Sequence, residues 1–259
     1  MGKIFAIVNQ KGGVGKTTTA INLGYSLSYL NRKILIVDLD YQANATTCLG
    51  INRGTVEKNI FDCMVEDEHI KDVIIKTKSE NVDLAPAKTL LEGIEERMVQ
   101  NPNRDFILHN QLYDIKDKYD YILIDCPPAL GIMTMNALCA ADSIIIPVQC
   151  EFLAMDGLTQ LLNSIRNAQM KKKVNREDLT IYGVLITMMD SRIITSQQVT
   201  TEIKTYFEEK IFKTVIPRNI SCSNATMYGV PVTEFSPKSK GSISYKQLAK
   251  EVIARDEGK

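Results

Sequence analysis

The sequence offers little that could hold a resident metal cluster. None of its six cysteines belongs to a C-x-x-C pair, and its two histidines, His69 and His109, are far apart in the chain. Zinc sites and redox pairs need closer spacings than these. Several cysteines stand inside apolar runs, so we expect small buried side chains in a protein of a reducing compartment.

Long apolar runs are missing too. No stretch approaches the roughly 18 apolar residues of a membrane-spanning helix. The N-terminus carries a five-residue apolar run without a cleavage-type signal, and no repeat, low-complexity segment or linker divides the chain. With 259 residues, 44% of them hydrophobic, the chain is long enough to bury a core of its own. These features predict a single cytoplasmic domain over residues 1–259.

The sequence also lacks a net charge, but its two parts differ. Residues 166–259 contain 16 Lys/Arg and 10 Asp/Glu, a net charge of +6, which leaves −6 for the rest of the chain. A basic C-terminal third indicates a surface that faces a polyanion, although solvated helix faces would give the same asymmetry.

The most informative stretch opens the chain. Residues 4–8 are all apolar, as in a strand that is buried on both faces of a parallel sheet. Three glycines follow, Gly12, Gly13 and Gly15, and then Lys16 and a run of threonines open an amphipathic helix. A strand, a glycine loop and a helix N-terminus in this order are typical of a phosphate-binding loop.

Each part of this loop has a chemical reason. Glycines let backbone N–H groups approach a phosphate, and the helix N-terminus adds unpaired N–H groups and the positive end of its dipole. Lys16 then reaches the β- and γ-phosphates, and the Thr17 hydroxyl takes a place on Mg²⁺. The loop residues predicted to bind ATP are Lys11, Gly12, Gly13, Val14, Gly15, Lys16, Thr17 and Thr18.

Two further apolar runs end in acidic residues. Residues 33–37 lead to Asp38 and Asp40, and residues 121–124 lead to Asp125. Because ligand chemistry in open α/β sheets gathers at the carboxyl ends of the strands, we expect these carboxylates beside the phosphate loop. Asp125 fits the Walker B pattern, in which an aspartate contacts Mg²⁺ through water. The predicted metal residues are Thr17, Asp38 and Asp125.

One position makes the loop more specific. Where the common G-x-x-x-x-G-K-[ST] motif has its first glycine, this chain has Gln10, and Lys11 follows. The loop resembles the deviant Walker A loop of the ParA/MinD ATPase family, and Asn9 with Gln10 resembles the ParA/Soj branch. The resemblance implies that Lys11 reaches across a dimer to the partner's nucleotide and acts in catalysis together with Lys16 and Asp40.

The same resemblance assigns the remaining ATP contacts. Residues 38–44 are similar to the family's D-x-D-P-Q-G-N segment, whose second aspartate, here Asp40, positions the hydrolytic water. The chain departs from that pattern at Tyr41 and Ala43, where Pro and Gly are usual, which leaves the stiffness of this switch and its turnover rate open. The residues whose backbone would frame the adenine are Pro217 and Asn219.

The resemblance also implies partners. In this family ATP closes a sandwich homodimer, which binds duplex DNA of the nucleoid without sequence preference, and a ParB/Spo0J-like protein stimulates hydrolysis. The DNA-binding residues that follow from it are Arg192, Arg218, Lys238 and Lys240. Ser221 and Asn224 stand where the family usually has Arg and Glu, so we expect DNA binding that is weaker and more salt-sensitive than the family norm.

The expected fold is a single doubly wound α/β domain. It has a mostly parallel sheet of about seven or eight strands with helices on both faces. Besides the strands that precede the motifs, the residue pattern predicts strands over 82–85, 143–148 and 181–187. It predicts helices over 60–65, 90–98 and 105–118.

Two other protein classes share the loop. A MinD-like membrane-positioning ATPase needs a C-terminal helix that is basic on one face and rich in Phe and Leu on the other. Residues 255–259 are mixed in charge and contain no bulky apolar side chain, so no stable membrane association is expected. An iron–sulfur carrier would need clustered interface cysteines. The MinD-like function stays the alternative.

Overall fold

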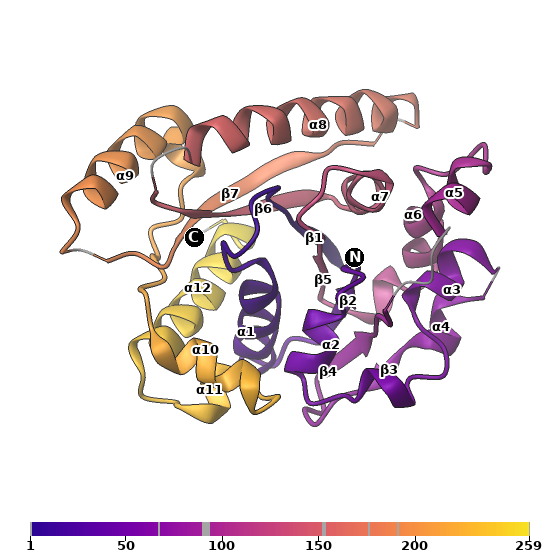
Figure 1. Cartoon of the computed structure of the whole chain (residues 1–259), viewed down its shortest axis with the longest axis horizontal. Coiled ribbons are helices and arrows are strands. Elements are labelled where there is room, and N and C mark those ends of the chain that lie inside the picture. The colour runs from indigo at the N-terminus through magenta and orange to yellow at the C-terminus, as the bar shows by residue number, and fades with distance from the viewer. Residues whose placement is uncertain are drawn as a thin grey trace.

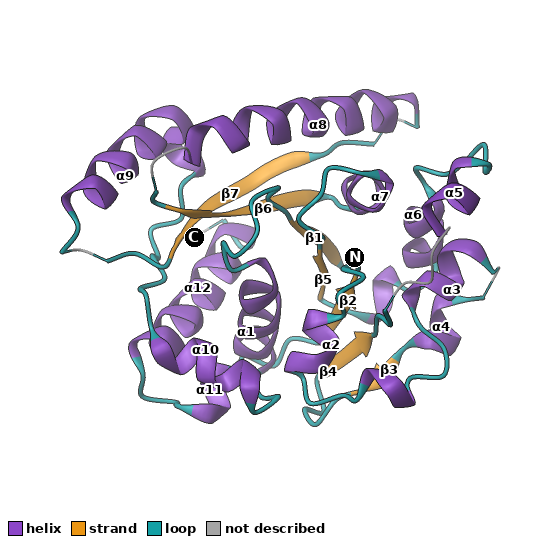
Figure 2. Ribbon diagram, viewed as in Figure 1, coloured by secondary structure: helices purple, strands orange, loops and turns teal. Residues whose placement is uncertain are grey.

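The computed structural model describes residues 2–66, 68–89, 94–151, 154–175, 177–190 and 192–258. Seven strands form one sheet in the order β3-β4-β2-β5-β1-β6-β7. Each neighbouring pair is parallel except β3 and β4, which are antiparallel. Figures 1 and 2 show helices above and below this sheet. The predicted doubly wound fold is therefore confirmed.

The strands are short and the helices vary widely in length. The strands are β1 (Lys3–Ile7), β2 (Ile34–Asp38), β3 (Ile75–Lys76), β4 (Val82–Ala85), β5 (Tyr121–Asp125), β6 (Ser143–Gln149) and β7 (Thr180–Thr187). The helices are α1 (Lys16–Ser28), α2 (Asn44–Cys48), α3 (Ile60–Val65), α4 (Ile70–Val73), α5 (Ile94–Val99), α6 (Ile107–Tyr113), α7 (Ile132–Ala140), α8 (Ala154–Val174), α9 (Ile194–Phe207), α10 (Ile220–Met227), α11 (Val232–Phe235) and α12 (Lys240–Asp256). Among the described residues, 3₁₀ turns cover Arg53–Thr55, Lys116–Lys118 and Glu208–Lys210.

Two apolar cores cover the two faces of the sheet. Along β1, Phe5 and Ile7 belong to one core, and Ile4 and Ala6 to the other, because successive strand residues point to opposite faces. The first core is completed by α1, α10 and α12, and the second by α3 to α9. Figure 1 shows α1 beside α12 on one side and α8 on the other. Burial on both faces explains why these strands are continuous apolar runs.

The register of the central strands places the predicted acids. Asp125 pairs with Ile7 across β1 and β5, and with Asp38 across β2 and β5. Parallel strands end at the same edge of a sheet, so both carboxylates reach the edge from which the glycine loop leaves β1. The chain turns from β1 to α1 there, in the centre of the molecule (Figure 1).

The sheet has two unlike edges. On one side, the two-residue strand β3 runs antiparallel to β4, and Lys76 of β3 pairs with Asp83 of β4 at 2.9 Å. On the other side, the segment after α9 runs along β7. There the amide of Phe212 donates to Val184 at 3.0 Å, and the amide of Ile216 donates to Ile186 at 2.9 Å. Both edges are thus covered by short or irregular segments.

Most predicted elements agree with the structure to within one or two residues. The prediction of one helix over 105–118 is wrong: α6 spans Ile107–Tyr113, and a 3₁₀ turn follows at Lys116–Lys118. The chain bends there because Ile115 and Tyr119 turn inward and are buried before β5 begins. Of the helix predicted over 90–98, residues 90–93 lie outside the described residues and the rest falls in α5. Within the described ranges, no helix combines the length and apolar character that a membrane crossing requires.

Candidate nucleotide site

The glycine loop has the backbone shape that a phosphate cradle requires. Gly13 and Gly15 adopt positive φ angles of 74° and 88°, which L-residues with a side chain rarely adopt. Gly15 directly precedes α1 in this left-handed conformation, so the free amides of the first helical turn face the loop. A Cβ built on Gly12 would have no heavy atom within 4 Å, so this residue faces open space.

Lys16 lies at the bottom of the loop. Its side chain is buried, with 7% of the residue exposed, and its Nζ donates to the carbonyl of Lys11 at 3.2 Å. Burial lowers the pKa of Lys16, and the nearby Asp125 is the largest influence in the opposite direction. A buried cation with a single hydrogen bond to a loop carbonyl has donors left for an anionic ligand.

Lys11 lies at the surface and is paired within its own chain. Its Nζ contacts Oε2 of Glu151, just after β6, at 2.6 Å, and both side chains are partly exposed. The backbone around it is fixed, since the Lys11 amide donates to the Asn9 side chain, which in turn donates to the Pro147 carbonyl. The structure thus places Lys11 beside the loop, and its expected action across a dimer stays a prediction.

Asp38 and Asp125 are fully buried, but their hydrogen bonding differs. Oδ2 of Asp38 accepts bonds of 2.7 Å from both the amide and the hydroxyl of Thr46, which tie α2 to the end of β2. Burial raises the pKa of Asp38 to about 6, although the Thr46 bonds oppose the shift. Neither oxygen of Asp125 accepts a hydrogen bond of ordinary geometry from the described residues. Burial, and next the charge of Asp38, raise the pKa of Asp125 well above its usual value.

The unpaired carboxylate fits a magnesium site. Among the described residues there is no group of three or more His, Cys, Asp and Glu side chains that would hold a metal alone. Mg²⁺ instead takes one or two protein oxygens and completes its octahedron with water and phosphate. Asp125 and the Thr17 hydroxyl, which faces it and lowers its pKa, supply such oxygens. Oδ2 of Asp38 is already bonded to Thr46. Its predicted metal role would therefore be electrostatic, since the carboxylate adds negative charge near the ion.

Asp40 shapes the loop that carries it. It is 5% exposed, its Oδ1 accepts from the amide of Gln42 at 3.0 Å, and its carbonyl accepts from the amide of Ala43 at 2.8 Å. Ala43 takes a left-handed conformation with φ of 52°, and α2 begins directly after it. The segment that this loop resembles has glycine at this position, and a positive φ is the conformation that glycine adopts most readily.

A pocket of about 250 Å³ adjoins the loop on the side of α10. Its lining includes Pro217 and Asn219, whose expected contact with the adenine stays a prediction. Seven further lining residues have no role in the sequence analysis: Thr187, Met188, Ile216, Cys222, Ser223, Thr226 and Tyr245. Thr187 donates from Oγ1 to the carbonyl of Val14 at 2.8 Å, which joins the end of β7 to the phosphate loop. Its position at the end of a strand was the available signal, since such positions line the ligand edge.

The four predicted DNA-binding cations fall into two groups. Arg192, Arg218 and Lys240 line a hollow of about 530 Å³ beside the nucleotide pocket. Lys238 is exposed but does not belong to that lining. The structure therefore brings three of the four together, and it also places the carboxylate of Asp190 among them.

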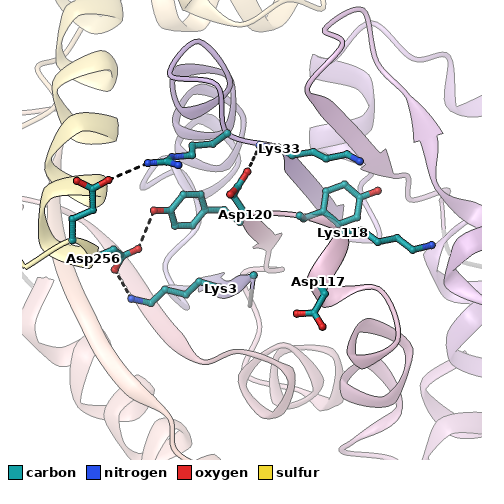
Figure 3. A pocket seen from close by; sticks show the side chains of 11 residues that line it. Lys3, Lys33, Asp117, Lys118, Asp120 and Asp256 are labelled. Atoms are coloured by element: carbon teal, nitrogen blue, oxygen red, sulfur yellow. Dashed lines mark hydrogen bonds and ion pairs between the residues drawn. The ribbon is translucent and has the colours of Figure 1, made fainter.

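Another hollow, of about 620 Å³, lies at the amino ends of the strands, on the side of the sheet opposite to the glycine loop. Two ion pairs lie in it: Lys3 contacts Asp256 at 2.5 Å (Figure 3), and Arg32 contacts Glu257 at 3.1 Å. Asp256 also accepts a hydrogen bond from the hydroxyl of Tyr121 at 3.0 Å (Figure 3). These contacts fasten the end of α12 to β1 and β5. The hollow lies away from the glycine loop and is better explained as a structural junction.

The unpaired Asp125 leads to a stability prediction. The pKa of this carboxyl is raised in the folded state. Its contribution to the free energy of unfolding is therefore fully present below the unfolded pKa of about 4, and it is lost as the pH rises through the folded pKa. Asp125→Asn removes the buried charge and leaves an amide that can donate to neighbouring carboxylates. We expect the nucleotide-free variant to melt at a higher temperature than the wild type at pH 7.5, because it carries no buried charge at this position.

This gain should fade as the pH is lowered and the wild-type carboxyl takes up its proton. Thermal melts followed by circular dichroism at decreasing pH provide the measurement. Asp117→Asn, at an exposed position of the opposite edge, is the matched control and should leave the melting temperature unchanged. A lower melting temperature for Asp125→Asn at pH 7.5 would contradict the electrostatic interpretation.

Comparison with known proteins gives a consistent family. A family model described as an AAA domain matches residues 2–181. The sporulation initiation inhibitor protein Soj of Bacillus subtilis is 50% identical over 254 residues, which cover 98% of this chain and 99% of that protein. The chromosome partitioning protein ParA of Myxococcus xanthus is 42% identical over 256 residues, covering 99% of this chain and 89% of that protein.

Solved structures agree with this result. A protein described as cobyrinic acid a,c-diamide synthase from Mycobacterium smegmatis, with bound ADP and magnesium, matches with a TM-score of 0.86 at 32% identity and covers 99% of this chain and 96% of its own. The septum site-determining protein MinD of Pyrococcus horikoshii, complexed with Mg-ADP, has a TM-score of 0.77 at 29% identity, covering 97% and 96%. The sequence relatives named Soj and ParA are more similar than either.

Proposed function

Because this chain belongs to the ParA/Soj family of chromosome-partitioning ATPases, we propose that it hydrolyses ATP with Mg²⁺ and binds duplex DNA without sequence preference as an ATP-closed homodimer. One observation carries the proposal: a buried lysine behind a glycine cradle, next to a buried carboxylate that accepts no hydrogen bond of ordinary geometry from the described residues. A cation and an acid in these positions can bind a nucleoside triphosphate and its metal ion, respectively.

Residues of this chain would share the chemical work. The glycine loop amides and Lys16 bind the β- and γ-phosphates and neutralise their charge. Thr17 and Asp125 would hold Mg²⁺, which supplies further charge neutralisation when bound. Asp40 orients a water whose oxygen bonds to the γ-phosphorus, while the bond to the β–γ bridging oxygen breaks and its electron pair stays on ADP. The products are ADP and phosphate.

Dimer closure would bring two phosphate loops face to face. Gly12 points into open space in the single chain, so it leaves room for a second copy. Lys11 lies beside it and would exchange the Glu151 carboxylate for the partner's nucleotide. The Glu151 carboxylate and the nucleotide are both anionic, so the charge of Lys11 is compensated in the single chain and in the dimer.

The DNA half of the proposal is supported by the hollow next to the nucleotide pocket. Three cations from separate segments, Arg192, Arg218 and Lys240, gather on a chain of zero net charge. Non-specific DNA binding arises from contacts of this kind to phosphates. A dimer would double the patch, which explains why binding should depend on ATP. We further propose association with the nucleoid and a ParB/Spo0J-like partner that stimulates hydrolysis.

The MinD-like alternative has less support. Structural similarity to MinD extends over nearly the whole chain, but at lower identity than to Soj. The described part of the last helix is also engaged: Asp256 contacts Lys3 and Tyr121, and Arg255 donates to the carbonyls of Tyr182 and Ile211. A helix end packed on the sheet in this way is poorly placed to enter a membrane surface.

Nucleotide-dependent DNA binding tests the proposal. With ATP and Mg²⁺ at low salt, the wild type should bind a random-sequence duplex, and without nucleotide it should not. Arg192→Ala should weaken binding and flatten the slope of affinity against salt by about one unit. Fluorescence anisotropy of a labelled duplex provides the measurement.

Gly12→Val serves as the matched dimerisation control. No atom of the single chain obstructs a side chain there, so this variant should bind ATP yet fail to dimerise and fail to bind DNA. Light scattering with ATP checks the dimer. The proposal is wrong if DNA binding is equally strong without nucleotide, or if Gly12→Val dimerises as tightly as the wild type.

A further inference from the structure

The basic hollow beside the nucleotide pocket contains a carboxylate. Its charged lining residues are Asp190, Arg192, Arg218 and Lys240, so one acid faces three cations among the described residues. Asp190 has a side-chain exposure of 17%, whereas Arg192 reaches 87%. A partly buried acid thus pairs with a highly exposed arginine at the place where the proposed function puts a DNA phosphate.

The contact between the two side chains has the geometry of a phosphate contact. Nε of Arg192 donates to Oδ1 of Asp190 at 2.9 Å, and Nη2 donates to Oδ2 at 2.7 Å. The amide of Arg192 donates to the same Oδ1 at 3.1 Å. Arginine binds carboxylates and phosphates through the same two-pronged fork, so the two anions compete for one set of donors. These bonds also lower the pKa of Asp190 to about 2, so it is ionised at neutral pH.

We propose that Asp190 is an internal stand-in for a DNA phosphate, which occupies Arg192 in the free protein and must be displaced when DNA binds. This inference rests on the proposed function and adds a residue that restrains it. Arg192 contributes to DNA binding only after it leaves Asp190, so Asp190 lowers the affinity for DNA. The affinity also depends on the conformation of the neighbouring loop that contains Pro217 and Arg218.

That neighbouring loop is part of the nucleotide pocket. Pro217 and Arg218 line both the pocket and the hollow. The segment before Asp190 is bonded to them: the amide of Met189 donates to the carbonyl of Ile216, and the amide of Arg218 donates to the carbonyl of Met189, both at 3.0 Å. Met188, which lines the nucleotide pocket, has a φ of 52°. Asp190 therefore lies two residues from a pocket wall and within the DNA site.

Asp190→Asn separates the charge from the shape. The amide keeps a carbonyl oxygen for the Arg192 backbone and loses the negative charge that holds the guanidinium. With ATP, Mg²⁺ and a random-sequence duplex, we expect affinity to rise roughly three- to tenfold at about 0.1 M salt. The slope of affinity against salt should stay near the wild-type value, since Arg192 contacts a phosphate in both complexes. Glu68→Gln, at a surface ion pair with Lys58, is the control for net charge and should change neither quantity.

A double variant identifies the mechanism. In the Arg192→Ala background, Asp190→Asn should give little of its gain, since no guanidinium is left to release. The inference is overturned if Asp190→Asn binds DNA like the wild type while Arg192→Ala binds more weakly, or if its gain is equal in both backgrounds. If no variant binds DNA with ATP, the proposed function itself fails and the inference fails with it.

Discussion

Lys16→Ala should abolish ATP binding in practical terms. The side chain is buried beneath the loop, where its charge faces the site of the phosphates. Removing one member of a buried, hydrogen-bonded charge pair costs about 2–5 kcal/mol, which corresponds to a roughly 30- to 5000-fold rise in Kd. Isothermal titration with ATP and Mg²⁺ measures the change directly.

The control for this experiment is Lys118→Ala. Lys118 is an exposed lysine at the opposite edge of the sheet, shown in Figure 3, and its removal should leave ATP affinity unchanged. Because burial disfavours the charge of Lys16, the variant should not be destabilised, and its melting curve separates lost binding from misfolding. ATP affinity within a factor of about three of the wild type would contradict the assignment of Lys16 to the phosphates.

Asp40→Ala should leave ATP bound and stop its hydrolysis. Loss of a group that orients or deprotonates an attacking water lowers turnover by roughly 100-fold or more. ATP should still bind, since the glycine loop and Lys16 are untouched, and the protein should accumulate as the ATP form. Phosphate release under single-turnover conditions, together with nucleotide titration, measures both quantities.

A second substitution at the same residue removes an ambiguity. The carboxylate of Asp40 also accepts the Gln42 amide, so Asp40→Ala alters the loop as well as the charge. Asp40→Asn keeps an acceptor for that amide and loses the charge. Both variants should fail to hydrolyse ATP if the carboxylate acts on water. If Asp40→Asn turns over at the wild-type rate, the role of Asp40 is to shape the loop.

The parts of the site that could be predicted from sequence are local in the chain. The glycine loop, Lys16 and the acids at the ends of β2 and β5 follow from buried apolar runs and from the requirement that parallel strands end at one edge. Continuous apolar runs also predict that helices cover both faces of the sheet, and they give the limits of most strands.

The parts that escaped prediction depend on contacts between distant segments. Thr187 reaches Val14, and Glu151 reaches Lys11, across more than a hundred residues in each case. Lys172 gives a further example: a lysine in a run of three at the end of a helix would be expected to be solvated, yet it is 2% exposed and donates to the carbonyls of Cys139 and Ala141. Its spacing of four residues from Ala168 continues the buried face of α8, which also contains Leu161 and Ile165. The sequence does not show, however, that carbonyls at the end of α7 accept from its ammonium group.

The covered edges of the sheet limit how copies of this chain assemble. An open strand edge offers a row of unpaired amides and carbonyls to any neighbouring chain, and each added copy exposes the next edge, so growth continues into fibres. Here a two-residue antiparallel strand with Lys76 closes one side, and the amides of Phe212 and Ile216 occupy carbonyls of β7 on the other. The homodimer that we propose would therefore form through the loops at the carboxyl ends of the strands. A contact between identical faces closes with two copies, so it would give a dimer and no larger assembly.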